Sequence, residues 1–187
     1  PVSAYLHSAT MVKAGVYLLS RLHPALSGSD AWTLTLSFVG GATMLMASVL
    51  ALRQTDLKRA LAYTSVMALG ALVMFLGSEA PIAIAAAMTF LLVHALYKAA
   101  LFLTVGSLEH GTGTREIQRL GGVALAMPMT SIAGLLAAFS MAGFPPFLGF
   151  IGKELKYEGA LAIAGEPVLL AGAAVLSTAM MVTLGAL

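Results

Sequence analysis

A histidine and a lysine, His94 and Lys98, stand four residues apart within an apolar run that begins near Pro81. On a helix such residues share one face, about 6 Å apart along the axis. A lysine at the centre of a bilayer costs about 2.5–3.5 kcal/mol, so lysines there are rare and usually functional. Histidine titrates near neutral pH, and burial can bring an amine into the same range. The pair therefore predicts two stations for a proton inside a membrane. The alternative is a lysine that snorkels to the interface, beside a histidine bonded to neighbouring backbone.

Other ionisable residues also lie in apolar surroundings. Lys153 and Glu154 follow a Phe-Pro-Pro-Phe sequence, and His7 and Lys13 lie in the first apolar segment. His7 and Lys13 are six residues apart, which on an ideal helix separates their directions by about 120°, so we expect them to serve successive partners. Lys13 is too deep to reach the interface without a tilted helix, which favours a functional role, whereas for His7 a structural role is equally open. Several hydroxyl side chains suit water binding or, more simply, hydrogen bonds between helices: Ser8, Thr10, Thr64, Ser65 and Thr89.

The composition restricts the class of protein. Of 187 residues, 59% are hydrophobic and 10% are charged, whereas soluble domains carry about 25% charged residues. With a mean hydropathy of +0.94, the chain is predicted to be an all-α, polytopic protein of a lipid bilayer. It has no cysteine, and its four histidines show no metal-ligand spacing. Phosphate-loop, dinucleotide and nucleophile motifs are also missing from the sequence. We therefore expect no metal, no cofactor, no nucleic-acid partner and no covalent catalysis.

Six apolar segments are each near the ~20 residues that a bilayer requires. We predict spans at residues 4–22, 31–52, 60–77, 81–107 and 127–160, with a sixth apolar run after Glu166 and Pro167. The predicted connections are 23–30, 53–59, 79–81 and 108–126, and His23 and His110 are expected to be solvated within them. Basic residues gather in 53–59 and 115–119, whereas acidic residues dominate the other connections, with Lys156 as the main exception. The positive-inside rule therefore places 53–59 and 108–126 in the cytoplasm, and residue 1 outside.

The fifth segment contains the interruption Gly143-Phe-Pro-Pro-Phe-Leu-Gly149. A continuous helix over 127–160 would be about 51 Å long, against a hydrocarbon core of about 30 Å. Pro145 and Pro146 lack amide hydrogens and clash with the preceding turn, while Gly143 and Gly149 let the chain bend. We predict two half-helices in one crossing, with Lys153 facing a polar cavity at the break. The alternative is a proline-kinked helix with Lys153 at the interface.

Four stretches resemble one family of membrane proteins. Residues 1–18, with His-Ser-Ala-Thr-Met-Val-Lys-Ala-Gly, are similar to the eighth helix of the large, antiporter-like, proton-translocating membrane subunits, and residues 56–65 to the start of their tenth. Residues 94–106 resemble their lysine-bearing eleventh helix, and residues 141–154 their broken twelfth. Two branches share this pattern: the A subunit of the Mrp-type multisubunit sodium/proton antiporters, and the largest antiporter-like subunit of respiratory complex I. Lys13 within Met-Val-Lys-Ala-Gly, residues 107–115 and residues 153–158 favour the Mrp branch.

The resemblance implies two inverted five-helix repeats, each with one broken helix. Residues 1–22 would be the last helix of the first repeat and residues 31–187 the second repeat. Residues 1–187 would then be a fragment of one proton-translocating membrane domain, as a start without methionine and an end inside an apolar run also indicate. The family's first broken helix, with its lysine, and the partner glutamate on an earlier helix would precede Pro1. Some relatives have a second histidine at the position of Phe90, so this chain departs from a relay of two histidines in this helix.

The implied activity is proton influx coupled to sodium efflux, carried out by a secondary transporter and not by an enzyme. The partners would be protons, sodium ions and the other subunits of a hetero-oligomeric antiporter complex in the plasma (inner) membrane. The proton path would contain His7 and Lys13, then Lys98 with His94, then Lys153 as terminal station with Glu154 modulating it. The alternative is a proton-pumping subunit of an NADH–quinone oxidoreductase, with the redox chemistry on other subunits.

Overall fold

The computed structural model describes residues 2–162, apart from the side chains of Ser3, His7 and Ala9, so the predicted sixth span lies outside the described residues. The described part is all-α, as predicted. Its elements are α1 (Val2–Ala4), the π-helix η1 (Tyr5–Ala9), α2 (Met11–Leu26), α3 (Asp30–Leu52), α4 (Leu57–Leu76), α5 (Pro81–Thr112), the 3₁₀-helix η2 (Ile117–Arg119), α6 (Val123–Ala126), α7 (Pro128–Ala142) and α8 (Leu148–Ala162).

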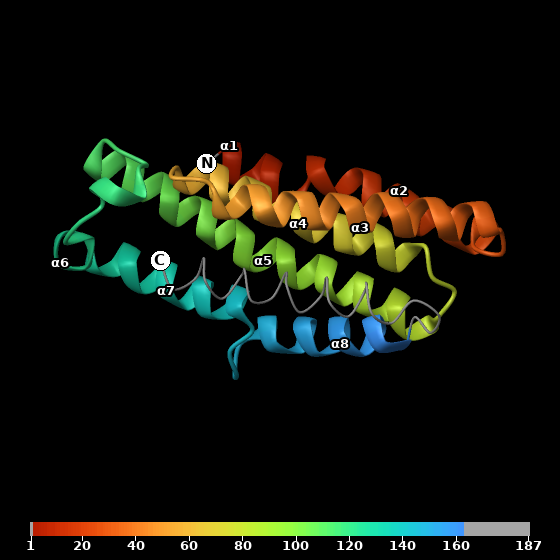
Figure 1. Cartoon of the computed structure of the whole chain (residues 1–187). Coiled ribbons are helices and arrows are strands. Elements are labelled where there is room, and N and C mark those ends of the chain that lie inside the picture. Colours follow the sequence, from red (N-terminus) through yellow and green to blue (C-terminus); the bar gives the residue numbers. More distant parts are fainter. Residues whose placement is uncertain (1, 163–187) are drawn as a thin grey trace.

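The long helix α5 is the axis of the molecule. Helices α1 to α4 lie to one side of it, and α7 and α8 lie end to end along the other (Figure 1). Helix α3 packs on α4 with the two backbones nearly touching. A Cβ on Gly40 of α3 would lie 2.6 Å from the Met74 nitrogen, and one on Gly70 of α4 would lie 2.7 Å from the Met44 nitrogen. Such small-residue contacts are typical of helices that pack in a membrane.

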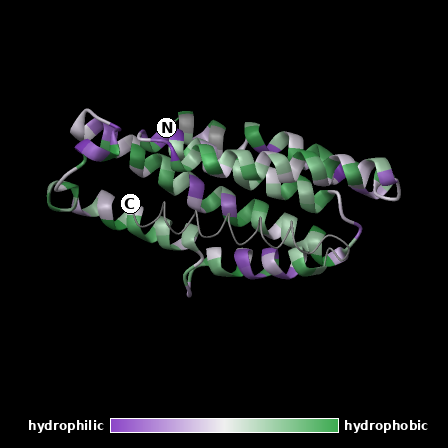
Figure 2. Cartoon of the chain, viewed as in Figure 1, coloured by the Kyte–Doolittle hydropathy of each residue, from purple (hydrophilic) through white to green (hydrophobic). Residues whose placement is uncertain are grey.

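Among the described residues, three helices are long and apolar enough to cross a membrane: α3, α4 and α5. They correspond to the predicted spans 31–52, 60–77 and 81–107. Large apolar side chains such as Leu34 and Phe38 lie exposed on α3, and Figure 2 shows mostly apolar ribbons interrupted by hydrophilic bands on α5 and α8. Helix α5 has 32 residues, or about 48 Å, so it extends beyond a hydrocarbon core of about 30 Å.

The first predicted span is wrong as a single helix. The chain forms a π-helix up to Ala9, turns at Thr10 with φ −117° and ψ −81°, and restarts as α2 at Met11. The 120° separation expected for His7 and Lys13 assumed an unbroken α-helix, so it does not apply here. Helix α2 also continues through Pro24 to Leu26. His23 therefore lies in its last turn, half-buried, with Nε2 3.0 Å from the Ser78 carbonyl oxygen, and not solvated in a connection.

Two further boundaries differ from the prediction. The Asp56 side chain caps α4 by accepting a hydrogen bond from the Arg59 amide at 3.1 Å, so Lys58 and Arg59 belong to the helix and not to the connection. Pro81 begins α5, as expected of proline in a first turn. At its other end α5 continues five residues past 107, so His110 lies on the helix, although it is exposed as predicted.

The predicted interruption of the fifth segment is present. Helix α7 ends at Ala142, Gly143 adopts a left-handed conformation with φ +75° and ψ 38°, and α8 begins at Leu148. A Cβ on Gly149 would lie 1.6 Å from the Ser140 carbonyl oxygen, so the first turn of α8 presses on the last turn of α7. The interruption is shorter than predicted because Leu148 and Gly149 are already helical.

Candidate functional site

His94 and Lys98 are completely buried, each with 0% of its surface exposed. Lys98 Nζ donates a hydrogen bond to the Leu61 carbonyl oxygen of α4 at 3.0 Å and another to the Thr64 hydroxyl. The ammonium head therefore points inward against α4, and the alternative of a snorkelling Lys98 is wrong. Thr64 makes the hydrogen bond between helices that was favoured for the hydroxyl side chains.

The acceptors of Lys98 are neutral oxygens. The Leu61 carbonyl also accepts hydrogen bonds from the hydroxyls of Thr64 at 2.9 Å and of Ser65 at 3.0 Å. A hydrogen bond to a charged group contributes about 1.5–3 kcal/mol. A buried ion costs several kcal/mol in desolvation, so these contacts offset only part of the cost of a charged Lys98.

His94 is held by aromatic rings. Its ring centroid lies 5.9 Å from that of Phe90 and 5.4 Å from that of Tyr97, the latter edge-on. Within residues 2–162, neither ring nitrogen of His94 nor the Tyr97 hydroxyl has a hydrogen-bond partner. A proton relay needs one nitrogen to accept a proton and the other to release one, and neither nitrogen is committed to a partner in the described residues.

Lys13 and His7 belong to the N-terminal elements. Lys13 is buried, with 6% of its surface exposed, in a helix that packs on α4. Its ammonium group, too, has no hydrogen-bond partner within the described part of the chain. The side chain of His7 lies outside the described residues, so its predicted role stays a prediction.

Lys153 is positioned by the break between α7 and α8. It is buried, and its Nζ donates a 2.7 Å hydrogen bond to the carbonyl oxygen of Ala142, the last residue of α7. Helix C-termini favour cations because their last carbonyls lack partners and the helix dipole is negative there. A Cβ on Gly143 would lie 2.4 Å from Lys153 Cδ, so glycine makes room for the lysine stem. Glu154, the next residue, is exposed.

Sequence reasoning missed Lys156. It was counted among the charges of a connection, but it lies in α8 with 2% of its surface exposed, and its Nζ is 5.3 Å from the centre of the Phe90 ring. The usable signal was its place three residues after Lys153, inside the apolar run 127–160, because residues three apart share one helix face.

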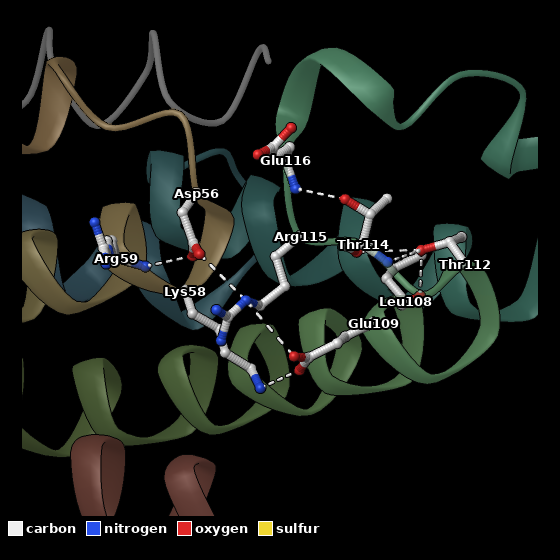
Figure 3. Close-up of polar contacts among 9 residues, drawn as sticks. All are labelled: Asp56, Lys58, Arg59, Leu108, Glu109, Thr112, Thr114, Arg115 and Glu116. Carbon is white, nitrogen blue, oxygen red and sulfur yellow. Dashed lines mark hydrogen bonds and ion pairs between the residues drawn. The ribbon is translucent and has the colours of Figure 1, made fainter.

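A second polar group gathers where α4 begins and α5 ends, and we call it the ion-pair cluster: Asp56, Lys58, Glu109 and Arg115 (Figure 3). Lys58 pairs with Glu109, while Arg115 Nε lies 3.2 Å from Asp56 and 3.6 Å from Glu109. These side chains are partly exposed. Backbone hydrogen bonds from Leu57 to Arg115 and from Ile117 to Thr55 hold the same connection. The cluster therefore fastens the 113–117 segment to α4.

A cavity of about 650 Å³ lies along the C-terminal part of α5, beside the ion-pair cluster. It is lined by Lys58, Phe102, Leu103, Gly106, Ser107, Glu109, His110, Gly111 and Met127. Phe102, one of the residues that line it, lies one turn along α5 from Lys98. The cavity thus extends from the polar end of α5 toward the buried lysine.

The buried ionisable groups share one sign of charge. Within the described residues, the buried basic side chains are Lys13, His94, Lys98, Lys153 and Lys156, and every aspartate and glutamate is at least partly exposed. A buried basic side chain that is not tied to a buried carboxylate can exist with or without its proton. Such groups can take up and release protons, which is the chemistry of a relay.

Comparison with known proteins identifies one family of membrane proteins. The family described as NADH:quinone oxidoreductase/Mrp antiporter, TM, matches residues 1–181. The chain is 44% identical over 174 residues to the A subunit of the Na(+)/H(+) antiporter of Bacillus subtilis (strain 168), covering 87% of this chain and 22% of that protein. It is also 44% identical over 161 residues to the A/B subunit of a probable K(+)/H(+) antiporter of Rhizobium meliloti (strain 1021), covering 86% of this chain and 16% of that protein. The chain thus spans about a fifth of the length of these relatives.

Two solved structures extend the likeness to the fold. The Mrp complex from Dietzia sp. DQ12-45-1b matches with a TM-score of 0.91 and 42% identity, over 100% of this chain and 21% of the matched chain. The membrane-bound sulfane sulfur reductase, an archaeal respiratory membrane complex, matches with a TM-score of 0.85 and 25% identity, over 98% of this chain and 39% of the matched chain.

Proposed function

The chain belongs to the NADH:quinone oxidoreductase/Mrp antiporter transmembrane family, and on that basis we propose that it is part of a protein that exchanges sodium ions for protons. That protein would work as a secondary transporter, not an enzyme, inside a hetero-oligomeric complex of the plasma membrane. The relatives named as antiporter subunits of the A type and the likeness to a solved Mrp complex support this assignment.

The observation that carries the proposal is the line of buried basic side chains along α5. Lys98 and His94 are completely buried on one helix face, and the buried Lys153 lies on α8, which packs along α5. Intramembrane lysines are expensive and are retained mainly where ions or protons pass. A scaffold helix in this position would need none of them.

The proposed proton path runs through the buried basic side chains. Lys13 and His7 receive a proton from the part of the protein that precedes them, and Lys98 and His94 form the central station. Lys153, against the end of α7, passes the proton toward the outside, with Glu154 as its exposed neighbour. The 650 Å³ cavity beside the ion-pair cluster gives water a route from the cytoplasmic ends of α4 and α5 toward Lys98. For proton influx the steps run in reverse.

The same proposal includes the finer architecture. The chain would make six crossings, with α7 and α8 as two halves of one of them. Residues 1–22 would close one repeat, and residues 31–187 would form its inverted counterpart. The orientation follows the positive-inside rule, with the ion-pair cluster in the cytoplasm. The burial of Lys156 in α8 supports that orientation because it removes the main exception from the count of loop charges.

The second candidate function is proton pumping, as a membrane subunit of a respiratory complex. The family description covers both kinds of protein, and the archaeal respiratory complex shares the fold at 25% identity. In that case proton movement would depend on electron transfer in other subunits.

The deciding experiment uses the full-length protein in its assembled complex, reconstituted in proteoliposomes. An imposed pH gradient, without NADH or quinone, should drive sodium uptake, with potassium measured in parallel. Lys98→Ala should lose exchange at an equal amount of assembled complex. Exchange that requires NADH would favour the respiratory alternative, and full exchange by Lys98→Ala would refute the proposed path.

A further inference from the structure

We infer that Lys156 is a proton station beyond Lys153, placed one helical turn closer to the Pro81 end of α5. The inference rests on the proposed function, because it extends the path described there. In that path Lys153 is the last station, whereas the structure has one more buried amine on the same face of α8.

The register between α8 and α5 carries the inference. A Cβ on Gly152 would meet Val93 at 3.3 Å, and a Cβ on Gly159 would meet Ala86 at 2.9 Å. Between these two glycines, Lys156 Nζ lies 5.3 Å from the Phe90 ring. The two helices therefore run in opposite directions, and each step along α8 moves toward Pro81.

This register orders the basic side chains by depth. Lys98 lies nearest the cluster end of α5, and His94 one turn further on. Lys153 lies beside the level of His94, because its neighbour Gly152 faces Val93. Lys156 lies at the level of Phe90, three residues further along α8, which is about 4.5 Å of helix axis. The line thus continues toward the end of α5 that the orientation places outside.

The packing explains why Lys156 faces inward. Glycines one turn before and after it bring the two backbones close, so the helix face that carries Lys156 is closed to lipid, and 2% of the residue is exposed. The Phe90 ring beneath the ammonium group offers a cation–π contact, which favours a cation without fixing its proton as a carboxylate would. Phe90 also touches His94, with ring centroids 5.9 Å apart, so one ring separates the two basic groups.

The proposed step is a proton transfer and nothing else. For influx, an ammonium at Lys156 releases one proton and becomes a neutral amine, and a neutral amine at Lys153 takes up that proton and becomes an ammonium. An intervening water molecule would carry it by accepting one proton and donating another. No electron moves, and no bond other than those to hydrogen is made or broken.

The test compares three substitutions in the full complex in proteoliposomes, with sodium uptake driven by a pH gradient. Lys156→Met and Lys156→Gln should reduce uptake at least tenfold. Lys156→Arg should fail equally, because a guanidinium keeps its charge but does not release a proton. Glu158→Gln, which changes an exposed charge on the same helix, should transport like the wild type.

The outcomes separate this inference from the function it rests on. If Lys98→Ala loses uptake while Lys156→Met keeps it, the proposed function stands and Lys156 is no station. If Lys98→Ala keeps uptake, the proposed function itself fails. Recovery by Lys156→Arg would make Lys156 a fixed positive charge and overturn the inference. The inference would also be overturned if Lys156→Gln and Lys156→Arg both failed to assemble into the complex in the membrane, because Lys156 would then have a structural role.

Discussion

Two lysine side chains next to α4 have opposite surroundings. Lys58, in the first turn of α4, pairs with Glu109 and keeps a quarter of its side chain exposed. Lys98, reaching in from α5, is fully buried against the neutral oxygens of Leu61 and Thr64. The carboxylate of Glu109 compensates the charge of Lys58, whereas the carbonyl and hydroxyl oxygens around Lys98 carry no charge. The ion-pair cluster is therefore suited to holding the structure, and the buried line to moving protons.

The magnitudes agree with this division. Exposed ion pairs usually contribute about 0.2–1 kcal/mol, so the cluster adds little even with several pairs. A buried ion costs several kcal/mol, and a hydrogen bond to it returns about 1.5–3 kcal/mol. The buried lysines therefore lower the stability of the fold, a cost that a role in moving protons explains. Substitutions in the two regions should accordingly differ in what they change.

The largest effect is expected from Lys153→Met in the full complex. The substitution keeps an unbranched apolar stem but removes the ammonium that donates to Ala142, so sodium uptake driven by a pH gradient should fall to background. Glu158→Gln on the same helix serves as the matched control. Uptake by Lys153→Met above about half of the wild-type rate would remove Lys153 from the path.

A smaller effect is expected from Thr64→Val, which keeps the volume of the side chain but removes one of the two acceptors of Lys98. A charged hydrogen bond of about 1.5 kcal/mol corresponds to roughly a tenfold loss of exchange. Ser65→Ala is the control, because the Ser65 hydroxyl donates to the same carbonyl but is not one of the two acceptors of Lys98. Equal rates for the two variants would show that the surroundings of Lys98 do not set the rate.

Gly143→Ala tests whether the break must leave room for Lys153. The new Cβ would lie 2.4 Å from Lys153 Cδ, and a left-handed backbone costs a residue other than glycine about 1–3 kcal/mol. We expect exchange to drop about threefold per assembled complex, because the lysine head is displaced from Ala142 by the methyl group. Gly113→Ala has the same backbone strain, with φ +72°, but meets nothing within 4 Å. Gly113→Ala should lower the stability of the complex without lowering exchange. A similar loss of exchange in both variants would mean that backbone strain, and not the space for Lys153, explains the effect of Gly143→Ala.

The smallest effect is expected in the ion-pair cluster. Glu109→Gln removes the carboxylate shared by Lys58 and Arg115, and because these ion pairs are partly exposed to solvent the expected loss of stability is small. The thermal midpoint of the purified complex should fall slightly, and exchange should stay within twofold of the wild type. Glu116→Gln, which breaks the exposed pair with Arg119, is the matched control. A tenfold loss of exchange in Glu109→Gln alone would move the cluster into the transport path.

The features that the sequence predicts well are those with a single physical solution. A lysine and a histidine deep in an apolar run must turn inward, and adjacent prolines cannot continue a helix, so the burial of Lys98 and the end of α7 at Ala142 were both predictable. The turn at Thr10 was not, because a π-helix leaves no clear mark in the sequence. Lys156 was missed because its neighbours Glu154 and Glu158 are charged and resemble a connection. Only the register of α8 on α5 shows that it is buried.

The central claim is that Lys98 must release its proton, whereas Lys58 need only keep its charge. The most direct measurement compares sodium-coupled proton flux for Lys98→Arg and Lys58→Arg in the full complex, per assembled complex, in the same proteoliposome preparation. Arginine keeps the positive charge but is not deprotonated in proteins. Lys58→Arg should match the wild type, because arginine can still pair with Glu109, and Lys98→Arg should fall to background. Wild-type flux in Lys98→Arg would contradict the account.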